Sequence, residues 1–80
     1  MNYAYIVYYA RVHILSLSQL EFCKTIHIVR PYLSSIENGK KRPSLDILER
    51  LAECCNIPLP ALLSIGQNKD EIIEFLENNI

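Results

Sequence analysis

Residues 15–45 read LSLSQLEFCKTIHIVRPYLSSIENGKKRPSL and contain the signals for two short helices and the joint between them. Ser18 is a favourable N-cap, and Glu21 lies three residues later, where its carboxylate can complete a capping box. A helix is therefore expected to begin at Ser18. Its inward face is expected to carry the apolar side chains Leu17, Phe22, Cys23 and Ile26.

A second helix is expected over about 29–37. Pro31 falls in its first turn, where a missing amide hydrogen costs little because those amides have no intrahelical acceptor. Residues 38–39, Asn-Gly, are expected to end the helix, since both tolerate left-handed backbone. Leu33 and Ile36 form the buried stripe. The outer face keeps side chains that are short or flat enough, or long and basic, to approach and contact a surface: Arg30, Pro31, Ser34 and Ser35.

Several motifs fall in one register: LSQ at 17–19, a small residue at Cys23, a hydrophobic residue at Ile28 and YLSSIENGKKRPSL at 32–45. In these motifs the chain resembles the Cro/phage-repressor (XRE) family of helix-turn-helix proteins, and is similar to small restriction–modification controllers and phage repressors. A bare helix-turn-helix pattern often arises by chance, whereas this combination rarely does. The resemblance covers roughly positions 11–63. It implies an all-α fold, with a five-helix lambda-repressor-like domain over residues 1–65 and a reading head at 18–42.

The resemblance also implies two classes of DNA contact. Bases are expected to be read by Arg30, Pro31, Ser34 and Ser35. The phosphate backbone is expected to be held by Gln19, Tyr32, Asn38, Lys40, Lys41 and Arg42. Arg30 alone in the base-reading set can make a bidentate contact to guanine, worth about 1–3 kcal/mol of discrimination. Pro31 can offer only van der Waals contact, for instance to a thymine methyl group.

Two residues of the reading head leave alternatives open. Tyr32 can reach a phosphate through its hydroxyl, or it can pack against the preceding helix. His27 stands at the joint, where the family usually has glycine. Either His27 adopts a strained left-handed conformation, or the turn differs from that of the family.

Charge is distributed unevenly along the chain. The formal net charge is −1, which by itself argues against DNA binding. Residues 24–42, however, hold five basic side chains against Glu37 alone, whereas residues 43–80 hold two basic and seven acidic ones. A charge run is commonly just a solvated face, but here the basic segment coincides with the motif. We therefore expect it to contact phosphates.

Residues 2–15, NYAYIVYYARVHIL, leave strand and helix both open. The β-branched and aromatic residues suit a strand with Tyr3, Tyr5, Val7 and Tyr9 on one face. The resemblance makes the segment the first helix, with an arginine seven residues before the glutamine, yet Val12 holds that position and Arg11 comes one residue early. One inserted residue before Ser16 would place Tyr3, Val7 and Ile14 in the core and Arg11 beside Glu37, as in the family's structural ion pair. Otherwise Arg11 extends to solvent.

The rest of the chain reads as core helices and a final helix. Ser44 is a favourable cap for a helix whose core side chains are Leu45, Leu48, Leu51 and Ala52. Residues 56–58 are expected to break it, residues 60–63 to form a short fifth turn or helix, and residues 66–68 to form a hinge or loop. Asn68 and Glu71 offer a second capping box for a helix over about 69–78. Its apolar stripe consists of Ile72, Ile73, Phe75, Leu76 and Ile80.

That stripe either folds back on its own domain or pairs with a second copy. We favour pairing with a second copy through residues 69–80, because five helices already close a core and an isolated helix of that length is marginal. A two-fold homodimer would set two recognition helices roughly 34–36 Å apart and read an inverted repeat in double-stranded DNA.

Other chemistry is not indicated. Cys23, Cys54 and Cys55 lack metal-ligand spacing, and neither His13 nor His27 completes a site, so no zinc, disulfide or cofactor is expected. The cysteines are interpreted as small buried hydrophobes of a cytoplasmic protein. The apolar residues 1–15 are too short to span a membrane and lack the features of a signal peptide.

Three functional hypotheses follow. The first is a transcriptional regulator, a repressor in the favoured form, controlled by its own concentration. The second is an antitoxin that binds a protein toxin and autoregulates its operon. An enzyme is rejected, because no nucleophile, base and orienting group converge by spacing.

Overall fold

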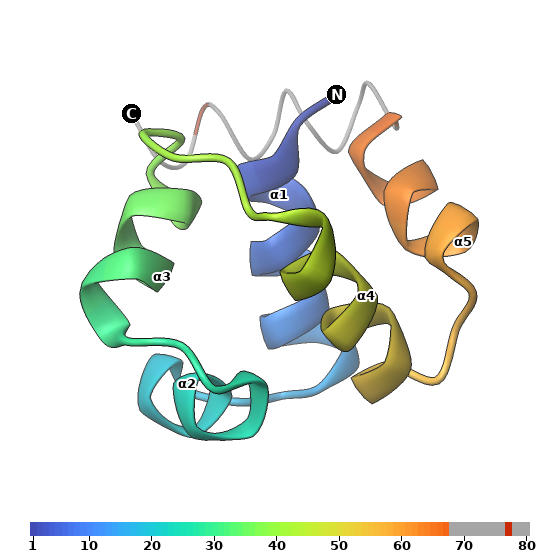
Figure 1. The fold of residues 1–80 in the computed structure, drawn as a ribbon. Coiled ribbons are helices and arrows are strands. Elements are labelled where there is room, and N and C mark those ends of the chain that lie inside the picture. Colours follow the sequence, from blue (N-terminus) through green and yellow to red (C-terminus); the bar gives the residue numbers. More distant parts are fainter. Residues whose placement is uncertain (68–76, 78–80) are drawn as a thin grey trace.

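A computed structural model describes residues 1–67 and 77 and shows a helical domain (Figure 1). In this part of the chain there is no strand, so the all-α prediction is confirmed and the strand alternative for residues 2–15 is wrong. The elements follow one another as α1 (Tyr3–Tyr9), the π-helical turn η1 (Ala10–Ile14), α2 (Gln19–Ile26), α3 (Arg30–Glu37), α4 (Leu45–Cys54), α5 (Leu59–Ser64) and the 3-10 turn η2 (Ile65–Gln67).

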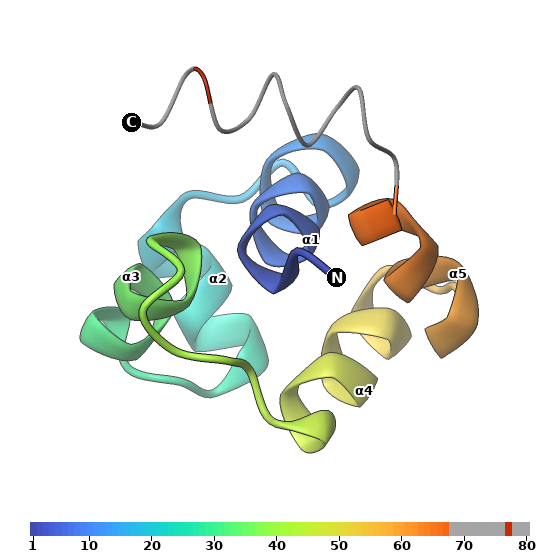
Figure 2. The ribbon, with the colours of Figure 1, turned by 90° about the horizontal axis from the view of Figure 1, so that it is seen from above.

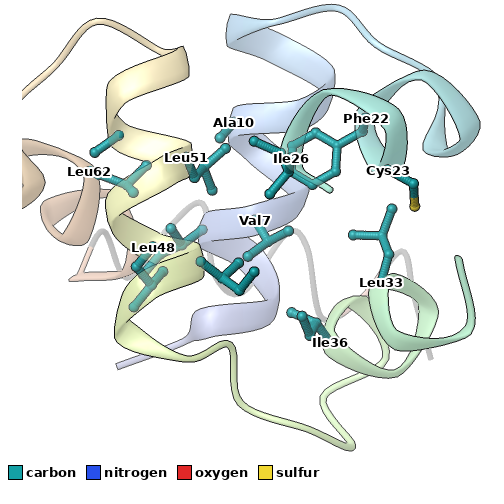
Figure 3. Close-up of a cluster of buried hydrophobic side chains, with 13 residues drawn as sticks. Val7, Ala10, Phe22, Cys23, Ile26, Leu33, Ile36, Leu48, Leu51 and Leu62 are labelled. Carbon is teal, nitrogen blue, oxygen red and sulfur yellow. The ribbon is translucent and has the colours of Figure 1, made fainter. Parts of the chain in front are cut away.

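Helix α1 lies in the middle of the domain. Seen from above in Figure 2, α2 and α3 lie on one side of α1, and α4 and α5 lie on the other. Burial of three consecutive residues, 5–7, agrees with a helix that is covered around most of its circumference. The core fills the space between these elements (Figure 3), and its largest fully buried side chains are Phe22, Ile6, Ile26, Leu33, Ile36, Leu51, Leu62 and Val7. Helices α2 and α3 are therefore held in place by their buried side chains in this core.

The inserted residue expected before Ser16 is accommodated by η1. The amide of Leu15 donates to the carbonyl of Ala10, five residues back, at 2.9 Å. This wider turn holds one residue more than an α-helical turn, and it restores the register of α1 relative to α2. Val7 is buried and Tyr3 packs against the core, as expected. Ile14 is 39% exposed, so its assignment to the core is wrong: the wide turn carries it to the rim.

The buried face of α4 differs from the predicted face at a single residue. Ser44 caps the helix as predicted, its Oγ accepting from the amide of Ile47 at 3.2 Å. Leu45, however, is 61% exposed, whereas Ile47 is buried. Residues 47, 48, 51 and 52 define the buried stripe, and at 3.6 residues per turn Leu45 lies roughly a quarter turn from its centre. The prediction of a core role for Leu45 is wrong for this reason.

Gly66 belongs to a packed contact. The residue is buried in η2, and a Cβ atom added to it would come within 2.7 Å of Ile6 Cδ1 and 2.9 Å of Ile6 Cγ1. Glycine therefore permits the close approach of η2 to α1, and the expected hinge is wrong at Gly66. The short fifth helix is present as α5. The expected helix over 69–78 and its stripe, Ile72, Ile73, Phe75, Leu76 and Ile80, lie outside the described residues apart from position 77.

Candidate nucleic-acid interface

The reading head begins with the capping box that the sequence predicted. The Glu21 amide donates to Ser18 Oγ at 3.1 Å, and the Ser18 amide donates to Glu21 Oε1 at 3.2 Å. The side-chain and backbone hydrogen bonds with Ser18 lower the pKa of Glu21 below its ordinary value. The two hydrogen bonds of the capping box fix the start of helix α2 at Gln19. Of its expected inward face, Phe22, Cys23 and Ile26 are buried and Leu17 packs partly buried against the core.

The joint between α2 and α3 is built on a left-handed histidine. His27 has φ 64° and ψ 52°, a conformation that costs an L-residue roughly 1–2 kcal/mol. Of the two alternatives for this position, the strained conformation is the one that occurs. Arg50 reaches across from α4, and its Nη1 donates to the carbonyl of Ile26 at 2.8 Å. Arg50, for which no sequence motif predicts a role, thus ties the joint to α4.

Helix α3 presents its first residues to solvent. Leu33 and Ile36 are fully buried, which fixes the rotation of the helix. Arg30 and Pro31 are exposed, and Ser34 and Ser35 are half-buried on the same helix. The four residues expected to read bases therefore all lie on α3, and its N-terminal end is the most accessible part.

The C-terminal end of α3 leads directly into the basic loop. The helix ends at Asn38 and Gly39 as predicted, and of the two residues that tolerate left-handed backbone Gly39 adopts it, with φ +76°, whereas Asn38 has φ −88°. The carbonyl of Ser35 accepts from the amides of Lys40 at 2.8 Å and Lys41 at 3.2 Å. These bonds fix the start of the basic loop to the recognition helix.

A chain of four polar side chains links η1, α2 and α3. Arg11 Nε lies 2.7 Å from Glu37 Oε2, and Arg11 Nη2 donates to Glu37 Oε1 at 3.1 Å. Gln19 Nε2 donates to the same Oε1 at 3.1 Å, and Arg30 Nε donates to Gln19 Oε1 at 3.3 Å. Arg11 Nη1 also donates to the carbonyl of Leu17 at 3.0 Å. Arg11 thus pairs with Glu37 instead of extending to solvent, and the pair continues to Arg30.

The position of Gln19 within this chain is informative. The resemblance predicts a phosphate contact for Gln19, and in the structure the side-chain amide of Gln19 also joins Glu37 to Arg30. A side-chain amide has two donor hydrogens and two acceptor lone pairs. One of each is used here, so one hydrogen is left for a phosphate oxygen. Gln19 can orient Arg30 and contact the backbone of a nucleic acid at the same time.

The basic loop is supported by tyrosines. Lys41 Nζ lies 5.9 Å from the centre of the Tyr32 ring, and the Tyr32 hydroxyl donates to the Arg42 carbonyl at 3.5 Å. The guanidinium of Arg42 lies 5.2 Å from the Tyr3 ring of α1. Lys40, Lys41 and Arg42 are all exposed. Tyr32 therefore contacts the loop while it packs, partly buried, against the core, and the expected contact of its hydroxyl with a phosphate stays a prediction.

The cysteines differ from one another in exposure. Cys23 is buried and Cys55 half-buried, and burial raises the pKa of both thiols. Cys54 is exposed, so its interpretation as a buried hydrophobe is wrong: it lies on the outer side of the last turn of α4. Within residues 1–67 and 77, no group of three or more His, Cys, Asp or Glu side chains is placed to hold a metal ion.

Comparison with known proteins agrees with this geometry. A family model described as helix-turn-helix matches residues 7–62, which include α2, α3 and most of their support. The chain belongs to the Cro/C1-type (XRE) helix-turn-helix family. The match covers the helix-turn-helix, a unit that places its second helix in the major groove of DNA. The matched range contains all four residues that link η1 to α3, so this Cro/C1-type protein carries them within its family domain.

A curated relative of this Cro/C1-type chain comes from a phage. The ImmF control region 10 kDa protein of Bacillus phage phi105 is 44% identical over 46 residues, which is 58% of this chain and 51% of the phage protein. The chain thus matches about half the length of that relative. No solved structure matches the chain. Among the described residues, no helix has the length and apolar character needed to cross a membrane.

Proposed function

We propose that this Cro/C1-type protein is a repressor that binds a palindromic operator as a homodimer, with Arg30 as its main base-reading side chain. The proposal is carried by the attachment of Arg30 to Gln19 at the exposed start of α3. Recognition helices present their N-terminal residues to base edges in the major groove. The bond to Gln19 uses Nε, and a bidentate contact to guanine O6 and N7 can use both Nη groups.

The other residues of the reading head are assigned by position. Pro31, Ser34 and Ser35 lie along the same helix as Arg30 and complete the base-reading surface. Contacts to phosphates come from the loop after α3 and from the second amide hydrogen of Gln19, with Asn38, Lys40, Lys41 and Arg42 as the loop residues. Each phosphate neutralised releases counterions, so binding should weaken steeply as salt rises.

Dimerisation is assigned to residues 69–80, through the stripe Ile72, Ile73, Phe75, Leu76 and Ile80. An isologous interface of this kind uses the same side chains from both copies. Two reading heads would then enter successive major grooves roughly 34–36 Å apart. Occupancy of the operator would follow the protein's own concentration. The name of the phage relative, which refers to a control region, supports a repressor.

Selection of bound duplexes from a random library tests the proposal. We expect an inverted repeat to be enriched, with a guanine in each half-site and centres one helical turn apart. A parallel selection with Leu76→Asp, which places a charge in the stripe, should enrich single half-sites, and light scattering should show a monomer. Enrichment of no sequence by the wild-type protein would contradict DNA reading. A dimer that persists in Leu76→Asp would contradict the interface.

A further inference from the structure

A groove opens between the start of α1, the basic loop after α3 and the turn η2. Its volume is about 550 Å³, and its wall includes Tyr3 and Ala4 from α1, Lys41 and Arg42 from the loop, and Gly66 from η2. Sites that hold ligands have volumes of about 300–1,000 Å³. The groove is therefore large enough to bind an occupant, and it lies away from the base-reading face of α3.

The groove is apolar on one side and basic on the other. Tyr3 and Ala4 supply the apolar side, and the exposed Lys41 and Arg42 supply the basic one. The guanidinium of Arg42 lies 5.2 Å from the centre of the Tyr3 ring, so the two sides meet. None of the described residues that line the groove is acidic. A matching occupant combines apolar side chains with negative charge.

The end of this chain has that combination. Residues 68–80 read NKDEIIEFLENNI and hold one basic and four acidic side chains beside the five apolar side chains of the predicted stripe. Glu71 and Glu74 are three residues apart, which makes them neighbours on the predicted helix over 69–78. The segment therefore offers an apolar face for one side of the groove and carboxylates for the other.

The segment also begins at the groove. Gly66 is part of the wall and is held against Ile6 of α1, and Gln67 is the last residue before the segment. A partner joined by so short a connection has an effective concentration in the millimolar range. This tether favours the chain's own segment over a free molecule of similar chemistry.

We infer that residues 68–80 dock in the groove of their own chain when the protein is a monomer, with the apolar stripe on the α1 side and the carboxylates beside Lys41 and Arg42. This rests on the proposed function, in which the same stripe pairs with a second copy and the two cations contact phosphates. One stripe cannot face both the groove and a second copy, so pairing empties the groove. Dimerisation thereby frees the basic loop for DNA, because the docked carboxylates compete with phosphates for its cations.

The reactivity of a cysteine placed in the groove tests the docking. Ala4→Cys, in a Cys54→Ser background, is labelled with a fluorescent maleimide over a range of protein concentrations. We expect slow labelling where sedimentation shows monomers, because the groove is filled, and faster labelling where it shows dimers. The added change Ile73→Asp, which places a charge in the stripe, should make labelling fast at every concentration.

Fast labelling of the monomer would overturn the inference, and so would protection confined to the dimer, since a second copy would then fill the groove. Lys41→Cys is a second probe on the exposed loop side, where a cysteine leaves the core untouched, and it should show the same pattern. No DNA enters this measurement. Failure of the proposed function would appear separately, as a selection that enriches no sequence.

Neutralising the segment tests the competition with DNA. Glu71→Gln with Glu74→Gln should bind a duplex with one half-site about fivefold more tightly than Glu49→Gln with Glu53→Gln, because an exposed ion pair changes an equilibrium constant by up to about fivefold. The second pair lies exposed on α4 and changes the net charge equally. Both are measured where the protein is monomeric. Equal affinities of the two double variants would show that the segment leaves the basic loop uncovered and would overturn the inference.

Discussion

Replacement of Arg11 with methionine should destabilise the domain strongly. The change removes two hydrogen bonds to Glu37 and one to the Leu17 carbonyl. It also leaves the Glu37 carboxylate, whose side chain is 9% exposed, without its cation. Removing one partner of a buried pair costs about 3–5 kcal/mol. Since Glu37 keeps its bond from Gln19, we expect the low end, about 3 kcal/mol.

Thermal unfolding followed by circular dichroism measures this cost. For a domain of this size 1 kcal/mol corresponds to about 4–8 °C, so the midpoint should fall by roughly 12–24 °C. The matched control is Asp46→Asn, which breaks the i,i+4 pair with Arg50 whose side chains are 66% and 41% exposed. An exposed pair of that kind is worth less than about 1 kcal/mol. If Arg11→Met lowers the midpoint no more than Asp46→Asn, the assigned role of the pair is refuted.

Three further predictions concern other parts of the domain. Gln19→Ala should preserve folding but release Arg30, so operator affinity should fall about tenfold, a loss of about 1.4 kcal/mol, in a filter-binding assay; unchanged affinity would exclude the orienting role. Gly66→Ala should lower stability in urea by about 1–3 kcal/mol, because its methyl group collides with Ile6; a neutral effect would contradict the close contact. Cys54 should react first with a thiol reagent, since the other two thiols are shielded, and Cys54→Ser should abolish the fast phase; a fast phase that survives would contradict this ranking.

Local chemistry made much of the fold predictable. The capping box at Ser18 depends on residues three apart, and the sequence displays it directly. The position of Pro31 in the first turn of α3 and the cap at Ser44 are equally local. The pairing of Arg11 with Glu37 required one extra residue, which η1 provides.

Features that depend on distant neighbours were not predictable. The tie from Arg50 to the joint at Ile26 forms only once α4 is packed against α2. The same is true of Gly66, which reads as a hinge until Ile6 is placed beside it. In α4, the choice between Leu45 and Ile47 depends on the rotation that packing selects, which periodicity leaves uncertain by about one residue.

In the candidate site, too, local features were predictable and contacts between distant residues were not. Its residues could be named from the motif, but the link from Gln19 to Arg30 could not, because it depends on how the starts of α2 and α3 meet in space.

The affinity of Arg30→Ala for the selected operator and for a scrambled duplex tests the central claim most directly. Loss of a bidentate contact to guanine should weaken operator binding by about 1–3 kcal/mol and leave scrambled-duplex binding nearly unchanged. Lys40→Ala, the control, should weaken both duplexes alike and reduce the salt dependence by about one unit of slope. Equal losses on both duplexes for Arg30→Ala would show that Arg30 contacts phosphates and does not read a base.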